Sequence, residues 1–245
     1  MLRYRKAFCF LCACIALAAT ALLITAFVTE NWVWSYVYQD KDDIQPDDYG
    51  QNKVPDNPND RGTYLGSIYF GLFNGVVYLN WGAGPRSYEQ SSKDYLADTY
   101  NEGLWISTIV FCALGIIMGL VTIGFAIYNT IKVPIGMITG IFGLYIWNGL
   151  AALFTGICMV LFIIEYYVSL IDGLLNDAHT AESWETQWVH FDYSFWLVVA
   201  AFCLLVVNFG VVKLSSKGED PDMTINMRMT SPQTNKGDMG VVLMY

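Results

Sequence analysis

Two cysteines near the amino end are the residues best spaced for redox chemistry. Cys9 and Cys12 form a Cys-x-x-Cys pair, a spacing that lets two thiols form a reversible disulfide when one of them is held as a thiolate. Both lie inside an apolar run from Ala7 to Val28, and no second pair supports an electron relay. We interpret them as small apolar side chains of a membrane helix. S-palmitoylation of Cys9 is better supported than redox cycling.

Acidic and histidine side chains raise the question of a metal site, and neither pattern fits one well. The chain has five closely spaced aspartates that match no EF-hand loop, so a solvated acidic loop is favoured over a calcium site. The two histidines, His179 and His190, have no cysteine nearby, which gives a zinc site little support. We predict no metal and no other cofactor. The aspartates are Asp40, Asp42, Asp43, Asp47 and Asp48.

Residue sets that carry out catalysis or transport are not found in the sequence. There is no Gly-rich phosphate loop and no nucleophile–base set. No charged residue lies deep in an apolar run, where proton relays and voltage sensors need one. Asn148 is the strongly polar residue well inside such a run, and we favour a hydrogen bond to a neighbouring helix over a functional polar site. We predict that the protein is not an enzyme.

The composition indicates that these residues belong to a protein built from membrane-spanning helices. Of 245 residues, 55% are hydrophobic and 14% are charged, which is too apolar for a soluble domain of this size. The net charge of −9, without a basic patch, argues against a nucleic-acid partner. All six cysteines lie in apolar segments, so the loops carry no disulfide framework, and no N-glycosylation sequon occurs. Four apolar runs each supply about 20 residues, enough to cross the bilayer.

Basic residues set the predicted orientation of these spans. Arg3, Arg5 and Lys6 precede the first run, and lysines follow the second and the fourth. Because Lys and Arg concentrate on the cytoplasmic side, we expect both ends of the chain inside the cell. The predicted order is cytoplasmic 1–6, helix 7–28, extracellular loop 29–104, helix 105–128, cytoplasmic turn 129–134, helix 135–164, extracellular loop 165–192, helix 193–212 and a disordered cytoplasmic tail 213–245.

Small residues four apart in the second and third spans indicate close helix packing. Such pairs let two helix backbones approach each other in lipid, where packing drives association. A short turn containing Lys132 and Pro134 makes these two spans an antiparallel hairpin. We favour packing within one chain and keep contact between copies as the alternative. The pairs are Gly115 and Gly119, Gly136 and Gly140, and Ala152 and Gly156.

The first extracellular loop is predicted to contain a sheet. Residues 32–38 and 63–81 are rich in β-branched and aromatic types, which is typical of strands, whereas 40–60 is rich in Asp, Pro and Asn and should be irregular. The predicted fold is an α-helical membrane protein: a four-transmembrane-helix bundle with a small extracellular antiparallel β-sheet formed by the long first loop. In the second loop, helical spacing from Tyr167 to Leu175 predicts that the third helix continues past the bilayer.

The last five residues are apolar although the tail before them is polar. A groove that adds a peptide as an extra strand and captures its carboxylate wants apolar side chains at the last residue and two before it. Leu243 and Tyr245 fit such a PDZ-type ligand. An ordinary tail tip without a partner is the equally weighted alternative.

Several stretches of the chain occur together in one known family. They are Gly124–Pro134, Gly140 and Leu144–Ala151 in the hairpin, Tyr69–Gly75 with Gly82, Gly84 and Arg86 in the first loop, Tyr193–Trp196 at the fourth span, and the Leu243–Tyr245 ending. In combination they resemble the clarins, and the resemblance covers nearly the whole chain. The Gly-Leu-Phe of the loop and the Val-Pro and Trp-Asn pieces of the hairpin are the most specific parts.

Clarins are distantly similar to the claudin and peripheral myelin protein group, whose outer loop carries a Trp and a Gly-Leu-Trp. Trp32 and Gly71-Leu72-Phe73 stand in those places here. Claudins have a disulfide in this loop, and vertebrate clarins have a cysteine, where this chain has Trp81, and a glycosylation sequon. The loop of this chain has no cysteine and no sequon. We therefore infer a divergent clarin, for which an invertebrate source is one explanation.

The resemblance implies a plasma-membrane scaffold of sensory cells, acting in hair-cell or photoreceptor maintenance, actin-rich protrusions, synapses or membrane trafficking. Expected partners are the lipid bilayer, other membrane proteins in the same membrane and a PDZ or actin-linked scaffold, with a homo-oligomer as an option. The alternatives are a claudin-like adhesion protein that acts through the first extracellular loop, or an auxiliary subunit of a channel.

Overall fold

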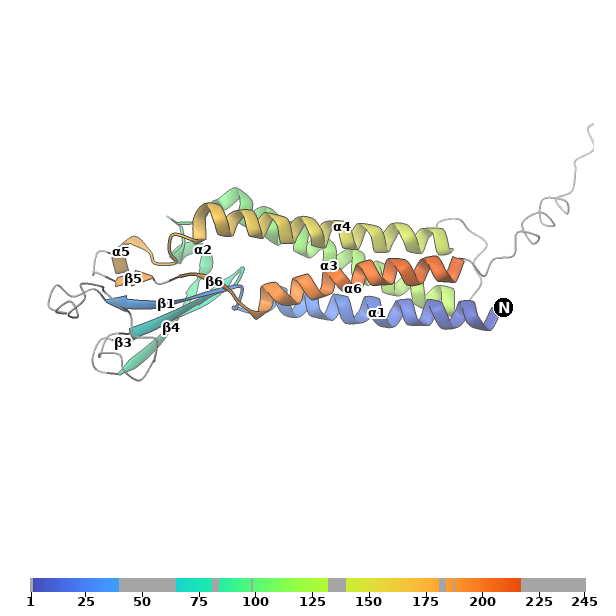
Figure 1. Ribbon diagram of the computed structural model, residues 1–245, viewed down its shortest axis with the longest axis horizontal. Helices are drawn as coiled ribbons and strands as arrows, with labels where there is room; N and C mark the ends of the chain where they lie inside the picture. The colour runs from blue at the N-terminus through green and yellow to red at the C-terminus, as the bar shows by residue number, and fades with distance from the viewer. Residues whose placement is uncertain are drawn as a thin grey trace, which may run out of the picture.

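The computed structural model describes residues 2–39, 65–80, 84–97, 99–131, 140–180, 184–186 and 188–216. Within these ranges, four helices are long and apolar enough to cross a membrane. They lie side by side as an elongated bundle, and a β-sheet lies at one end of it (Figure 1). The helices are α1 Leu2–Val28, α3 Glu102–Ile131, α4 Ile141–Glu165 and α6 Tyr193–Ser216.

The four helices form a closed ring of contacts. Helix α1 packs against α3 and α6, and α4 packs against the same two helices from the other side. The start of α1 and the end of α6 both lie at the end of the bundle farthest from the sheet (Figure 1). The loop after α1 and the loop after α4 are therefore brought together at the sheet end.

The sheet is antiparallel and takes strands from two distant parts of the chain. Its order is β4-β3-β2-β1, after which β5 and β6 both pair with the other edge of β1. The first loop contributes β1 to β4, as predicted, but the second loop adds β5 and β6, which the prediction lacked. They close the edge of β1, which would otherwise expose unpaired backbone groups. The strands are β1 Val33–Gln39, β2 Leu65–Phe70, β3 Asn74–Asn80, β4 Pro85–Ser91, β5 Trp184–Thr186 and β6 His190–Phe191.

The two faces of the sheet differ because side chains alternate along each strand. The inner face carries buried apolar residues such as Val37, Ile68 and Val77. It is covered by the segments around two short helices, α2 Ser92–Tyr95 and α5 Asp177–Thr180. The outer face carries partly exposed aromatic residues instead.

The third span ends differently from the prediction. Helix α4 is followed by one π-helical segment, η2 Tyr166–Leu170, and Gly173 then adopts φ +153°. The predicted continuation of the third helix is therefore present, but it ends at Leu170 instead of running on to Leu175. Leu170 and Leu174 are both fully buried, so the apolar character of Leu174 reflects packing beneath the sheet.

Several sequence predictions lie outside the described residues. They concern the acidic stretch with its five aspartates, the turn with Lys132 and Pro134, Trp81 and Gly82, Gly136, and the tail with Leu243 and Tyr245.

Candidate functional site

The region where the sheet meets the helices brings together the loop residues that the sequence singles out. Trp32 is fully buried there. Its indole Nε1 donates to the carbonyl of Ala26 on α1 at 2.7 Å, and its amide donates to the Phe70 carbonyl on β2 at 3.0 Å. Its own carbonyl accepts from the amide of Asp192 at 2.9 Å. One residue therefore joins α1, the first loop and the segment that enters α6.

Gly71 is a glycine because another backbone passes directly over it. A Cβ at this position would lie 2.4 Å from the Thr29 carbonyl oxygen and 2.6 Å from the Glu30 Cα. Its amide donates to the Asn74 carbonyl at 2.9 Å, which closes the turn between β2 and β3. Its carbonyl accepts from the Ser92 hydroxyl at 2.8 Å. The turn is thus pinned to the end of α1 on one side and to α2 on the other.

Leu72 and Phe73 attach the same turn to two helices. The Leu72 side chain is buried, and its carbonyl accepts from the indole Nε1 of Trp105 on α3 at 2.9 Å. The Phe73 ring packs edge-on against Phe27 of α1, with ring centroids 5.0 Å apart, and stays 43% exposed. The loop signature of Trp32 and Gly71-Leu72-Phe73 is therefore a set of attachments between sheet and bundle.

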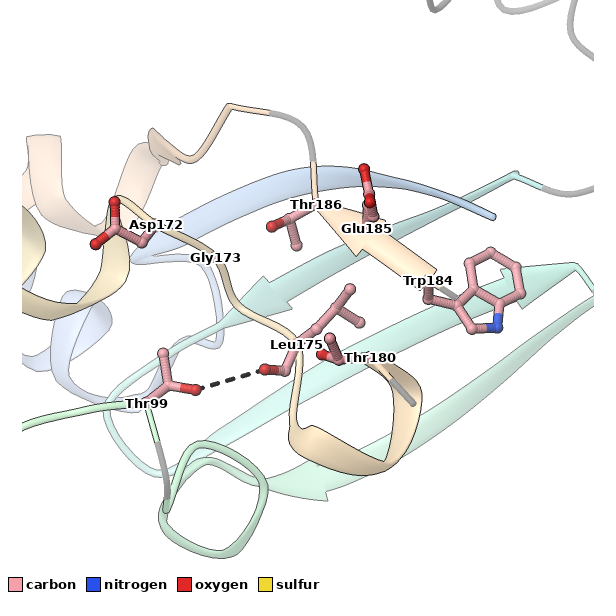
Figure 2. Close-up of a pocket in the computed structure, with 8 residues that line it drawn as sticks. All are labelled: Thr99, Asp172, Gly173, Leu175, Thr180, Trp184, Glu185 and Thr186. Atoms are coloured by element: carbon pink, nitrogen blue, oxygen red, sulfur yellow. Dashed lines mark hydrogen bonds between the residues drawn. The ribbon is translucent and has the colours of Figure 1, made fainter. Parts of the chain in front are cut away.

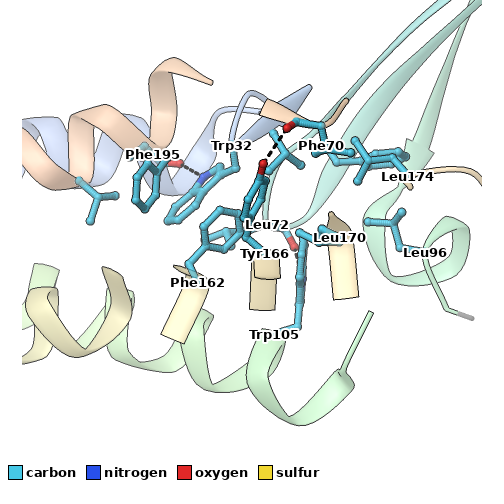
Figure 3. Close-up of a cluster of buried hydrophobic side chains, with 14 of the residues drawn as sticks. Trp32, Phe70, Leu72, Leu96, Trp105, Phe162, Tyr166, Leu170, Leu174 and Phe195 are labelled. Atoms are coloured by element: carbon cyan, nitrogen blue, oxygen red, sulfur yellow. Dashed lines mark hydrogen bonds between the residues drawn. The ribbon is translucent and has the colours of Figure 1, made fainter. Parts of the chain in front are cut away.

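Phe162 on α4 lies at the centre of this region, as Figure 3 shows. Its ring centroid lies 4.6 Å from that of Trp32, 5.8 Å from that of Phe195 and 6.2 Å from that of Trp105. Close by, the Tyr166 hydroxyl donates to the Val189 carbonyl at 2.7 Å. We call this set the aromatic junction. It consists of Trp32, Leu72, Trp105, Phe162, Tyr166, Phe191 and Phe195.

A buried carboxylate lies beside the junction. Glu165, the last residue of α4, is fully buried, and its Oε1 accepts from the Asn101 amide at 2.7 Å. Asn101 in turn caps α3, since its Oδ1 accepts from the amides of Gly103 and Leu104. The second oxygen of Glu165 has no hydrogen-bond partner within the described residues, and the Ser169 side chain lies near the carboxylate group. The carboxylate thereby ties the end of α4 to the positive start of α3.

The two histidines lie in different surroundings. His179 Nδ1 is 2.6 Å from Asn176 Oδ1 and 3.3 Å from the Tyr95 hydroxyl. Burial raises the pKa of Tyr95, so this phenol stays protonated at neutral pH. His190 instead lies against the ring of Trp34 on the outer face, at 5.2 Å. The described residues contain no group of three His, Cys, Asp or Glu side chains placed to hold a metal.

A small cleft of about 420 Å³ opens beneath α5 at the edge of the sheet. Figure 2 shows its polar lining, with the carboxylates of Asp172 and Glu185 on opposite sides of the cleft. The Thr99 hydroxyl donates to the Leu175 carbonyl across 3.5 Å. These groups support the loop, and they bring no nucleophile next to a base.

The small residues predicted for helix packing contact three different helices. A Cβ on Gly115 would lie 2.9 Å from Thr155 Oγ1 on α4, and one on Gly119 would lie 2.4 Å from Thr20 Oγ1 on α1. Gly156 faces the ring of Phe202 on α6. Of the others, Ala152 packs at the margin of the same core, and Gly140 is the residue before α4.

Asn148 makes a buried polar contact between α4 and α6. Its Nδ2 donates to the Leu205 carbonyl at 3.0 Å, and its Oδ1 accepts from Nδ2 of Asn208 at 2.8 Å. Both amides are fully buried. Nothing in the spacing of the sequence indicates that Asn208 in the fourth span faces Asn148.

Cys9 is the predicted palmitoylation site. Its side chain is fully buried within the bundle, and palmitoylation there stays a prediction. The exposed cysteine of this helix is Cys14, which lies deeper in the apolar span.

Comparison with known proteins adds to this geometry. A family model described as Clarin-2-like matches residues 4–212, a range that includes the sheet, α3 and α4, and all but the outermost residues of α1 and α6. The chain is 25% identical to clarin-2 of Homo sapiens over 213 residues, covering 86% of this chain and 88% of that protein. It is 30% identical to human clarin-3 over 152 residues, covering 60% and 67%. With human clarin-1 the identity is 24% over 168 residues, covering 66% and 72%.

Proposed function

This chain belongs to the clarin family, and we propose that it is a non-enzymatic organiser that holds partner proteins side by side in the plasma membrane. As a four-span membrane protein of the clarin type, the chain carries the sheet on its four helices, and we call this sheet the platform. The observation that carries the proposal is the aromatic junction, because it fixes the sheet to the helices of the bundle.

Three side-chain donors show how firmly the platform is attached. The Trp32, Trp105 and Tyr166 side chains each donate to a backbone carbonyl at the junction, over 2.7 to 2.9 Å. A buried indole or phenol that loses such a partner costs about 1–3 kcal/mol. A surface attached in this way keeps one orientation relative to the bilayer, which is what lateral assembly with neighbouring proteins requires.

The orientation that we propose places the sheet outside the cell and both chain ends in the cytoplasm. It is supported by the position of Arg3, Arg5 and Lys6 in the sequence and of Lys213 in the last turn of α6. The start of α1 and the end of α6, to which these residues belong, lie at the end of the bundle opposite the sheet (Figure 1). Lys and Arg gather on the cytoplasmic side of membrane proteins.

The cytoplasmic tail supplies the link to scaffolds in this proposal. Deletion of the last three residues should abolish binding to a PDZ-domain scaffold while surface delivery continues. Leu243→Ala and Tyr245→Ala should do the same. Met244→Ala is the matched control, because alternate residues of an added strand point away from the groove. Unchanged binding after deletion would remove the tail from the proposal.

The biological setting that we propose comes from the resemblance to clarins. It is the maintenance of sensory cells such as hair cells or photoreceptors, through actin-rich protrusions, synapses or membrane trafficking. Loss of the protein from such cells should then disturb the arrangement of membrane proteins at these sites before the cells degenerate.

Adhesion between cells is the second candidate function, and the exposed aromatic outer face of the sheet is the observation that favours it. Two cell populations that express differently coloured versions would separate the two functions. Enrichment at mixed contacts, lost in a Tyr36→Asp variant that still reaches the surface, would show adhesion. Uniform distribution, with the two colours co-purifying when expressed in one cell, would show lateral assembly.

A further inference from the structure

The outer face of the sheet gathers aromatic rings near the helices. Trp34 on β1 pairs with Tyr69 on β2, and their rings stack at 6.5 Å with an interplanar angle of 20°. Tyr78 on β3 meets the Tyr69 ring edge-on, at 6.1 Å and 90°. The rings of Tyr69 and Tyr78 are therefore perpendicular and form the two walls of a corner.

A groove of about 540 Å³ runs along this corner. Its lining adds Glu30 and Asn31, the first residues after α1, to the two tyrosines. The Asn31 amide is held in place, since its Nδ2 donates to Asp192 and its Oδ1 accepts from the Tyr193 hydroxyl. The remaining lining residues are Ser67 and Val76.

The chemistry of this groove suits a cation. Aromatic faces attract positive charge within about 6 Å of the ring centroid, and the Glu30 carboxylate adds a full negative charge. No lysine or arginine lines the groove within the described residues. A trimethylammonium group satisfies both features, because it presents a diffuse charge on an apolar surface and needs no hydrogen-bond acceptors.

The depth of the groove indicates where such a cation comes from. Glu30 follows the last residue of α1, Val28, by two positions, and Tyr193 is the first residue of α6. Tyr193 and Trp196 are about half exposed, as expected of the aromatic belt at the membrane surface. The headgroup layer extends only about 5–7 Å beyond the hydrocarbon, so residues that directly follow a membrane span, as Glu30 and Asn31 follow α1, are expected within it.

We propose that this groove binds the headgroup of a phosphocholine lipid, with the trimethylammonium group between Tyr69 and Tyr78 and close to Glu30. The inference does not depend on the organiser function. It assigns the outer face of the sheet a lipid ligand, in addition to any protein that the platform assembles.

Saturation-transfer NMR on the full chain in maltoside micelles tests the headgroup directly. The probes are phosphocholine and 3,3-dimethylbutanol, a neutral molecule of the same shape as choline. We expect transfer to the methyl protons of phosphocholine and not to those of the neutral molecule. Equal transfer to both would overturn the proposal, because charge would then contribute nothing.

Two pairs of variants locate the binding. Tyr78→Leu should weaken phosphocholine binding about two- to fivefold, and Glu30→Gln should weaken it by up to about fivefold. Tyr88→Leu is the matched aromatic control, since Tyr78 and Tyr88 are each 41% exposed but lie on opposite faces of neighbouring strands. Asp172→Asn is the charge control. Binding that survives Tyr78→Leu together with Glu30→Gln would overturn the site.

A lipid competition distinguishes a headgroup from a protein cation. The chain is captured from micelles that contain equal amounts of phosphatidylcholine and phosphatidylethanolamine with the same acyl chains. We expect phosphatidylcholine to be enriched on the wild type and on Tyr88→Leu, and not on Tyr78→Leu. Equal retention on the wild type, or binding of lysine amide tighter than that of phosphocholine, would overturn the lipid assignment.

Discussion

The aromatic junction and the middle of the bundle are held together by different means. The junction uses large rings around Phe162, with indole and phenol groups bonded to backbone carbonyls. The middle of the bundle uses glycines, threonines bonded to their own helix, and a single pair of amides within the described residues. Each region is stabilised by the kind of contact that its own surroundings, water or lipid, make favourable. Burying a large side chain is favourable where the alternative is water, whereas lipid rewards close backbone approach instead.

The largest test of this contrast is Phe162→Ala at the centre of the junction. Truncating a buried phenylalanine removes its contacts and leaves a cavity, and should cost about 3–5 kcal/mol. Unfolding by SDS titration from maltoside micelles would measure it. Phe142→Ala on the same helix is the control, because Phe142 is 56% exposed on the outside of the bundle. Similar losses of stability in both variants would show that the buried ring at the junction contributes no more than an exposed ring on the same helix.

Gly71→Ala tests the close backbone approach at the edge of the junction. The new methyl group must displace the chain at Thr29 and Glu30, and we expect a loss of about 1–3 kcal/mol. In Gly124→Ala, by contrast, the methyl group meets no atom within 4 Å, so that variant should be neutral or slightly stabilised by its helix propensity. A neutral Gly71→Ala would contradict the proposed attachment of the turn to α1.

A double-mutant cycle on Asn148 and Asn208 measures the polar contact in the middle of the bundle. Each single change to leucine should cost between about 0.6 kcal/mol, the average for side-chain hydrogen bonds between membrane helices, and about 1.7 kcal/mol, the largest value found for one. The double variant should lose less than the sum, because no buried amide then lacks its partner. Additive losses in the same SDS titration would show that the two amides do not interact.

Among the changes that remove or strain a contact, Gly119→Ala should have the smallest effect. Its methyl group would meet the Thr20 hydroxyl, but alanine favours the helix by about 0.8–1 kcal/mol over glycine, so the net loss should stay below about 1 kcal/mol. Removing the hydroxyl in Gly119→Ala with Thr20→Ala should give a protein more stable than the wild type. If the double variant is no more stable than Gly119→Ala alone, the Thr20 hydroxyl is not the group that the new methyl group clashes with.

Sequence alone was enough to predict the elements that bury a continuous surface. Each long helix has an apolar run of membrane length, and β1 has alternating aromatic residues, so local pattern and final structure agree. The strands β5 and β6 could not be predicted, because segments of three and two residues carry no periodicity. They become strands only by pairing with β1.

The partners within the candidate site were harder to predict than the elements. The spacing of Gly115 and Gly119 indicates close approach, yet it does not show that one faces α4 and the other α1. Trp105 and Phe162 read as ordinary aromatic residues near the ends of membrane spans. Their role depends on which loop folds back over them, and that is decided by tertiary contacts far apart in the chain.

The pairing of β1 with β5 and β6 has a consequence for the order in which the molecule is completed during synthesis. Strand β1 leaves the ribosome early, but the segment that closes its second edge comes just before the last helix, as the Asn31–Asp192 contact at a separation of 161 residues illustrates. The platform is therefore finished only after α3 and α4 have been made and the start of α6 has emerged. Until then one edge of β1 stays open, and a chain cut short before β5 carries an unpaired strand that a chaperone or a second copy can bind.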